Sequence, residues 1–217
     1  MKEPDYDELA LDVRAYHGAG TAVAFYLLHK RFTYVTINHM GEVVYRNDKH
    51  RKILKFKRRI PSEKELKLIK REVMIYLAGP MAAGIHFGRV DHDDIKLFLD
   101  FKSQLNQRER PIGEYLKSQL NMKEKWVGEY LWGRDFEDTK LLIYAPWNWH
   151  AIDALADELH KREKIRYKEV RKIIREAIED YHEAVRSREI AVDQGYLDFV
   201  KQVEEKKARL KEAMKAK

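Results

Sequence analysis

One segment of the chain carries most of the information about its fold: Ala15-Tyr16-His17-Gly18-Ala19-Gly20-Thr21-Ala22-Val23. Apolar side chains recur around it at steps of three and four residues, which predicts a helix over residues 6–30. In such a helix His17 and Thr21 lie one turn apart on the same face, and Gly18 directly follows the histidine. Each glycine inside a helix costs about 1 kcal/mol relative to alanine, so the two glycines of this segment weaken it.

A β-hairpin and a second helix are expected after this segment. Residues 33–38 are rich in β-branched and aromatic side chains, which predicts a strand. Gly41 marks a turn and residues 42–45 a second strand, so the two strands form a hairpin. The next helix begins at a capping box at Ser62. It runs into the small residues of 79–84, which permit close packing against a neighbouring helix.

The C-terminal half is predicted to be helical. One helix starts at Ala145-Pro146 and keeps its apolar face to Leu159, and another covers residues 168–181. A charged helix at 196–214 carries a short heptad-like seam. Two interpretations of that helix stay open: it lies on the domain, or it binds a partner or a second copy of the chain.

The fold class that follows is mainly α (α+β), with a small β-hairpin or sheet. We expect a helical domain over residues 1–187 and a charged C-terminal helical extension over 188–217. A chain of 217 residues is long enough for one sizeable core with such an extension.

Two further segments follow the first in a fixed order: Tyr76-Leu77-Ala78-Gly79-Pro80-Met81-Ala82-Ala83-Gly84-Ile85-His86-Phe87-Gly88 and His92-Asp93-Asp94-Ile95. Together the three segments resemble the peptidase domain of the FtsH-type ATP-dependent zinc metalloproteases and their stand-alone relatives. Members of that family have AYHEAGHAV in the first segment, then a helix with an AG-x-AAE…FG pattern, then an Asp-Leu pair that opens another helix. The resemblance covers roughly residues 6–104 and extends more weakly to 149–177.

The resemblance implies a zincin-like helical metalloprotease domain, with a zinc site built from two histidines one turn apart and a later aspartate. His17 matches the first histidine of the family motif, and Asp94 matches the aspartate. Gly18 stands where the family has the glutamate that acts as general base, and Thr21 stands where it has the second histidine. Glycine accepts no proton, and a threonine hydroxyl is a poor zinc ligand.

We therefore expect a protease fold that has lost its protease chemistry: a pseudoprotease that acts as a binding or regulatory protein. No residue is assigned a catalytic role, and His17 and Asp94 are expected to be vestiges of a metal site. No cofactor is expected under this hypothesis. The partner would be a protein or peptide, bound beside the strand at 33–38 by edge-strand pairing.

A first alternative is that the protein is still an enzyme. His17, His92 and Asp94 could form a rearranged site for zinc in a metal-dependent hydrolase or peptidase. A capping role for His92 and Asp93 at a helix start explains the same residues more simply, and we favour that interpretation.

A second alternative is nucleic-acid binding. The chain has a net charge of +7 and a pI of about 9.3, and residues 49–59 include seven Lys, Arg or His side chains from His50 onward and no acid. An anion-binding surface would use the basic residues of this stretch, namely Lys52, Lys55, Lys57, Arg58 and Arg59. We rank this hypothesis third, because few aromatic residues lie nearby to stack on bases.

Composition sets the remaining expectations. The absence of cysteine excludes disulfides, thiolate metal sites and a cysteine nucleophile. Charged residues make up 36% of the chain, a composition typical of heat-adapted intracellular proteins. The sequence has no apolar run of membrane-spanning length and no signal-peptide core at its start, so we expect a cytoplasmic protein with no membrane partner.

FtsH-type domains form rings, so the resemblance also implies a homo-oligomer. The chain has no phosphate-binding loop of an ATPase, however.

Overall fold

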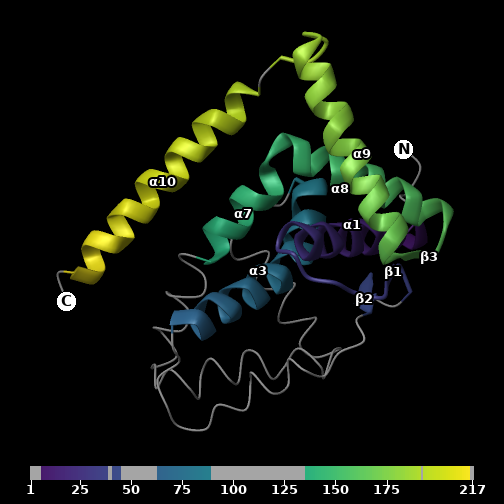
Figure 1. Ribbon diagram of the computed structural model, residues 1–217, viewed down its shortest axis with the longest axis horizontal. Helices are drawn as coiled ribbons and strands as arrows, with labels where there is room; N and C mark the ends of the chain where they lie inside the picture. Colours follow the sequence, from purple (N-terminus) through teal and green to yellow (C-terminus); the bar gives the residue numbers. More distant parts are fainter. Residues whose placement is uncertain (1–5, 39–40, 45–62, 89–134, 192, 216–217) are drawn as a thin grey trace, which may run out of the picture.

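The computed structural model describes residues 6–38, 41–44, 63–88, 135–191 and 193–215. In these ranges the protein is mainly helical, with one small antiparallel sheet, which confirms the predicted mainly α class (Figure 1). The helices are α1 (Tyr6–Leu27), α3 (Glu63–His86), α7 (Phe136–Tyr144), α8 (Pro146–Lys161), α9 (Tyr167–Arg186) and α10 (Gln194–Lys215).

The sheet has three strands in the order β2-β1-β3, formed by β1 (Tyr34–Thr36), β2 (Glu42–Val44) and β3 (Lys164–Arg166). The predicted hairpin is confirmed: Val35 of β1 pairs with Val43 of β2, and Gly41 before β2 has a φ of 74°. Val35 also pairs with Ile165 of β3 on its other side.

This strand order corrects one prediction. Both sides of β1 are occupied, so the expectation that a partner pairs with the strand at 33–38 is wrong. The open edges in the described sheet belong to β2 and β3. The sequence did not predict β3, because three residues between two long helices give too short an alternation to recognise.

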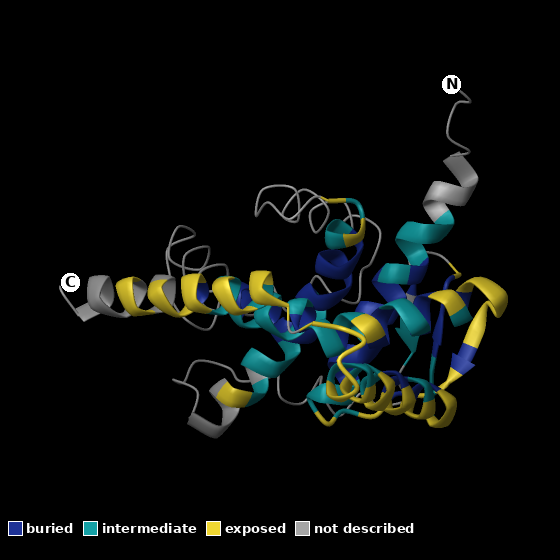
Figure 2. Cartoon of the chain, turned by 90° about the horizontal axis from the view of Figure 1, so that it is seen from above, coloured by how far each residue is buried: buried dark blue, intermediate teal, exposed yellow. Residues whose placement is uncertain are grey.

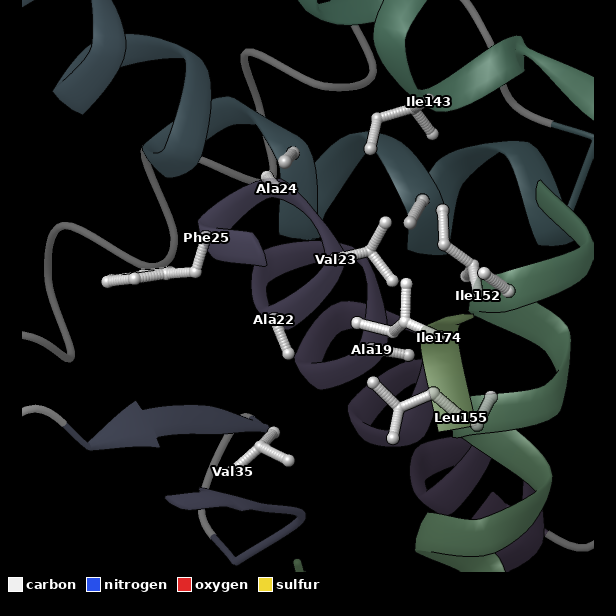
Figure 3. Close-up of a cluster of buried hydrophobic side chains, with 14 of the residues drawn as sticks. Ala19, Ala22, Val23, Ala24, Phe25, Val35, Ile143, Ile152, Leu155 and Ile174 are labelled. Atoms are coloured by element: carbon white, nitrogen blue, oxygen red, sulfur yellow. The ribbon is translucent and has the colours of Figure 1, made fainter. Parts of the chain in front are cut away.

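Helix α1 lies at the centre of the core, in contact with α3, α8 and the hairpin. Large apolar side chains from α7, α8 and α9 gather around its inner face, which carries Ala19 and Val23 (Figure 3). The side chains of Ile143, Ile152, Leu155 and Ile174 are fully buried there.

Helices α1 and α3 approach each other very closely, as the small residues predicted. A Cβ atom on Gly20 would lie 2.4 Å from the Cβ of Ala82 and 2.8 Å from the carbonyl oxygen of Ala78. Helix α3 runs without a break through Pro80, although proline removes one helical hydrogen bond. Burial of the flanking residues against α1 outweighs that loss.

Helices α8, α9 and α10 form the C-terminal half. Pro146 occupies the first turn of α8, where its missing N–H is harmless. The carboxylate of Asp193 accepts a hydrogen bond from the backbone N–H of Tyr196 at 3.0 Å and so caps α10. This helix confirms the one predicted over 196–214.

Helix α10 stands apart from α1 and the sheet, and most of its described residues are exposed (Figures 1 and 2). It contacts the rest of the chain through aromatic rings: Phe199 lies 5.0 Å from Tyr144, and Tyr196 lies 5.6 Å from Trp147. None of the helices in the described ranges is long and apolar enough to cross a membrane.

Candidate functional site

The motif segment of α1 is buried rather than open to solvent. His17 is 1% exposed, and the alanines around it are fully buried. The histidine lies where three elements meet: its own helix α1, the hairpin turn at Gly41 just before β2, and α3 at Gly79.

The ring of His17 is held in one tautomer. Its Nδ1 lies 3.0 Å from the carbonyl oxygen of Gly41, and a carbonyl oxygen can only accept, so Nδ1 carries the proton and donates. A histidine that binds metal through Nε2 makes the same kind of hydrogen bond from its other nitrogen. The hydrogen bond thus fits the predicted role of His17 as a former metal ligand and equally fits a structural histidine.

The Nε2 side of the ring faces helix α3. A Cβ on Gly79 would lie 2.7 Å from Nε2 and 2.9 Å from Cε1 of His17, and 2.3 Å from the hydroxyl oxygen of Thr21. The Thr21 hydroxyl donates to the backbone oxygen of His17 one turn earlier, at 2.9 Å. Thr21 stands where the resemblance places the second metal ligand, and its hydroxyl forms a hydrogen bond within its own helix.

Gly18, at the position of the family base, faces the sheet. A Cβ there would lie 3.2 Å from Cγ2 of Val35 and 3.5 Å from Gly41. No proton acceptor is contributed by this position, because glycine has no side chain.

The described residues alone do not complete a catalytic zinc site. Such a site normally has three protein ligands, and within the described ranges no three His, Asp or Glu side chains are grouped so as to hold a metal ion. Of the predicted ligands only His17 falls inside these ranges. The other predicted site residues lie outside the described residues: His92, Asp94, Lys52, Lys55, Lys57, Arg58 and Arg59.

A second polar cluster, which the sequence did not predict, joins α1, α3 and α8 beside the motif. The ring of Tyr16 stacks on His86 at a centroid distance of 3.6 Å and lies 6.0 Å from the ring of Trp149. The Tyr16 hydroxyl donates to the carboxylate of Asp153. Asp12 and Tyr16 share one face of α1, as Trp149, Asp153 and Asp157 share one of α8, but nothing in the sequence pairs the two helices.

The fold disfavours the charged forms of Asp153 and Tyr16. Burial raises the pKa of Asp153, the hydrogen bond from Tyr16 opposes that rise, and the Asp157 carboxylate adds to it. Burial and the Asp153 carboxylate likewise raise the pKa of the Tyr16 hydroxyl, so it stays protonated and donates.

Replacing Asp153 with asparagine is expected to stabilise the protein at pH 7. Because the pKa of Asp153 is raised in the folded state, its stabilising contribution is present below about pH 4, the ordinary aspartate value, and is lost as pH rises through the raised pKa. The asparagine amide stays neutral at every pH, so we expect Asp153→Asn to gain up to about 1 kcal/mol at pH 7 and nothing at low pH. Urea unfolding at several pH values measures this difference. The exposed Asp180 on α9, replaced in the same way, serves as the control. An equal response of both variants at every pH would contradict the assignment.

The chain matches no protein-family model and no curated protein. The resemblance to the FtsH-type peptidase domain therefore stays a prediction from the three motif segments.

Proposed function

We propose that this protein is a metallopeptidase-like scaffold that binds an extended protein or peptide segment without hydrolysing it. One observation carries the proposal: the residue in the general-base position is Gly18, packed against Val35 and Gly41 of the hairpin. Loss of a positioned base alone lowers a hydrolytic rate by about 10²–10⁴.

The edge of β3 suits an extended partner. Ile37 N–H donates to the oxygen of Glu163, and Tyr167 N–H donates to the oxygen of Thr33, so these residues direct their backbone groups toward β1. In an antiparallel ladder the next residue points the other way, which turns the backbone of Lys164 outward. An added strand gains main-chain hydrogen bonds at such an edge.

The side chains along this edge favour an acidic partner. Within 161–168 the exposed basic residues outnumber the single exposed acid, Glu163. These basic residues are Lys161, Arg162, Lys164, Arg166 and Lys168. Part of this charge is already balanced, since Arg162 pairs with Glu158 and Glu169. Lys164 and Arg166, on the strand itself, are the two best placed to select acidic side chains.

A direct test uses a fluorescein-labelled decapeptide that alternates acidic and β-branched residues, with a basic peptide of the same length for comparison. We expect fluorescence anisotropy to report binding of the acidic peptide only. The double variant Lys164→Glu/Arg166→Glu should weaken binding at least about tenfold, since two favourable charge contacts become repulsive. Lys172→Glu, an exposed change on α9, is the matched control. Binding that is equal for both peptides, or unaffected by the double variant, would refute the β3 site.

The same samples test whether the protein hydrolyses the peptide. After incubation with zinc, mass spectrometry should detect the intact peptide alone. The rearranged-site hypothesis predicts zinc-dependent cleavage that disappears in His17→Ala, and that result would replace the pseudoprotease proposal.

A further inference from the structure

Helix α9 ends at a turn that has an arginine where glycine is usual. Arg188 follows the C-cap residue Ser187 and has a φ of 61°. Its backbone N–H donates to the oxygen of Val185 at 3.2 Å, and the N–H of Glu189 donates to the oxygen of Ala184 at 3.0 Å. This pair of hydrogen bonds is the Schellman motif, which most often has glycine at the residue of positive φ. A side chain with a Cβ adopts this conformation at a cost, so the stop at the end of α9 is weaker than one built on glycine.

The segment between α9 and α10 contains no strong helix breaker. Residues 187–193 read Ser-Arg-Glu-Ile-Ala-Val-Asp, without glycine or proline. The bend between the two helices (Figure 1) therefore depends on the turn at Arg188 and on the contacts that α10 makes with the rest of the chain. Those contacts include aromatic rings of α7 and α8, and most described residues of α10 are exposed.

The large apolar side chains that are exposed in the described ranges flank this bend: Ile190 is 41% exposed and Leu197 is 46% exposed. In a continuous helix, positions 190 and 197 lie on one face, two turns apart. When two such helices pack antiparallel about a two-fold axis, Ile190 of each chain meets Leu197 of the other. That reciprocal contact is the one an isologous interface requires.

From these features we infer that the protein forms a closed dimer by exchanging α10 between two copies of the chain. The segment 187–193 straightens, α9 and α10 become one helix, and α10 of each chain packs on α7 and α8 of the other. The exchange keeps the aromatic contacts of α10, because the same residues meet across the two chains. It also releases the positive φ of Arg188 and removes Ile190 and Leu197 from water.

This dimer answers the question that the sequence left open for the C-terminal helix, since its partner is a second copy of the chain. It differs from the ring that the resemblance implies, because a two-fold contact closes after two copies. The inference does not rest on the proposed binding of a peptide at β3.

The first experiment measures molar mass by light scattering on a sizing column over a range of protein concentrations. Samples are refolded from urea at high protein concentration, so that slow opening of the native chain does not hide the exchange. We expect the native protein to form a dimer, and Arg188→Gly to raise the dimer dissociation constant at least about tenfold. Glycine adopts the turn without the Cβ cost and disfavours the continuous helix.

His29→Gly is the matched control for that variant. His29 follows α1 with a φ of 57°, and the N–H of Lys30 donates to the oxygen of Phe25 at 2.7 Å, as in the turn after α9. The chain beyond His29 is held in the core, where Phe32 is 6% exposed, so its dimer constant should equal that of the native protein. A native protein that stays monomeric at every concentration, or equal effects of the two glycine variants, would overturn the inference.

Ile190→Glu tests the contact at the two-fold axis. Ile190 is exposed in the single chain, so the variant should keep its fold, and circular dichroism checks this. We expect the dimer dissociation constant to rise at least about tenfold, because a charge replaces an apolar contact in each half of the interface. A dimer as strong as that of the native protein would contradict the proposed contact.

A cross-linking experiment distinguishes exchange of α10 from side-by-side association. The chain has no cysteine, so Tyr144→Cys and Phe199→Cys each introduce a single thiol. The native rings at these positions lie 5.0 Å apart. The two variants are refolded together and treated with a short bis-maleimide. We expect a covalent product that contains one chain of each variant. A dimer that gives no such product would refute the exchange of α10.

Discussion

Replacement of Gly20 by alanine is expected to lower the free energy of unfolding by about 2 kcal/mol. A new Cβ would meet the Cβ of Ala82 at 2.4 Å and the carbonyl oxygen of Ala78 at 2.8 Å. The second contact is with backbone, so no side-chain rotation relieves it and the helices must move apart. Overpacking costs about 1–3 kcal/mol, and the contact with backbone places Gly20→Ala at the upper end of that range, so a loss of about 2 kcal/mol remains after the gain of about 1 kcal/mol in helix propensity.

Gly18 offers the matched control, because the same substitution in the same helix meets a different environment. A Cβ there would lie 3.2 Å from the end of the Val35 side chain, a tight contact with a side chain rather than with backbone, and 3.5 Å from Gly41, an ordinary contact. We expect Gly18→Ala to change stability by less than about 1 kcal/mol. Chemical denaturation followed by circular dichroism measures both variants.

A double variant locates the effect of Gly20→Ala. Combining it with Ala82→Gly removes the closer contact and leaves the one with the Ala78 oxygen. Partial recovery of stability is therefore expected, with a favourable coupling between the two sites. Equal losses in Gly18→Ala and Gly20→Ala, or no coupling with Ala82, would show that helix propensity and not the α1–α3 contact governs this position.

The elements predicted well from the sequence are those with strong local signals. The repeat of apolar residues through 6–30 predicted α1, and the turn at Gly41 between two β-rich runs predicted the hairpin. Proline in the first turn and a clear apolar face predicted α8. Each of these signals lies within a single element, so it needs no knowledge of the packing.

The features that were missed depend on contacts between distant residues. β3 forms because residues 164–166 lie beside β1, more than a hundred residues earlier in the chain. Because β3 pairs with β1, β1 is the central strand of the described sheet, and one open edge of that sheet belongs to β3. The contact of Tyr16 with Asp153 likewise joins helices that no sequence pattern relates.

Of the predicted site residues, His17 alone lies within the described residues. Its residue type and spacing predicted a metal ligand, and the structure places its Nδ1 at hydrogen-bond distance from the carbonyl of Gly41. The sequence did not predict that Gly79 lies beside the His17 ring. A glycine has no side chain, so no sequence pattern points to this contact. The sequence predicted a role for position 17 through a resemblance, and the structure describes its surroundings.

Replacement of Gly41 by alanine is expected to have a larger effect than Gly20→Ala. It should lower the free energy of unfolding by about 3 kcal/mol or more. The φ of Gly41 is 74°, a conformation that costs other residues about 1–2 kcal/mol. In addition, a Cβ would lie 2.1 Å from the carbonyl oxygen of Arg14 and 2.9 Å from the backbone nitrogen of Gly18. Both are backbone atoms of α1, so the hairpin would have to move away from the helix.

Gly88 separates the two contributions to this loss. Its φ is 69°, nearly the same, but no atom of the described residues lies within 4 Å of a Cβ built there. Gly88→Ala should therefore show the conformational cost alone, about 1 kcal/mol. Movement of the hairpin would also break the hydrogen bond from His17 to Gly41, so Gly41→Ala and His17→Gln should lose less stability together than the sum of their separate losses. If Gly41→Ala and Gly88→Ala were equally destabilising and the losses at 41 and 17 were additive, the hairpin would not be fastened to α1 through His17.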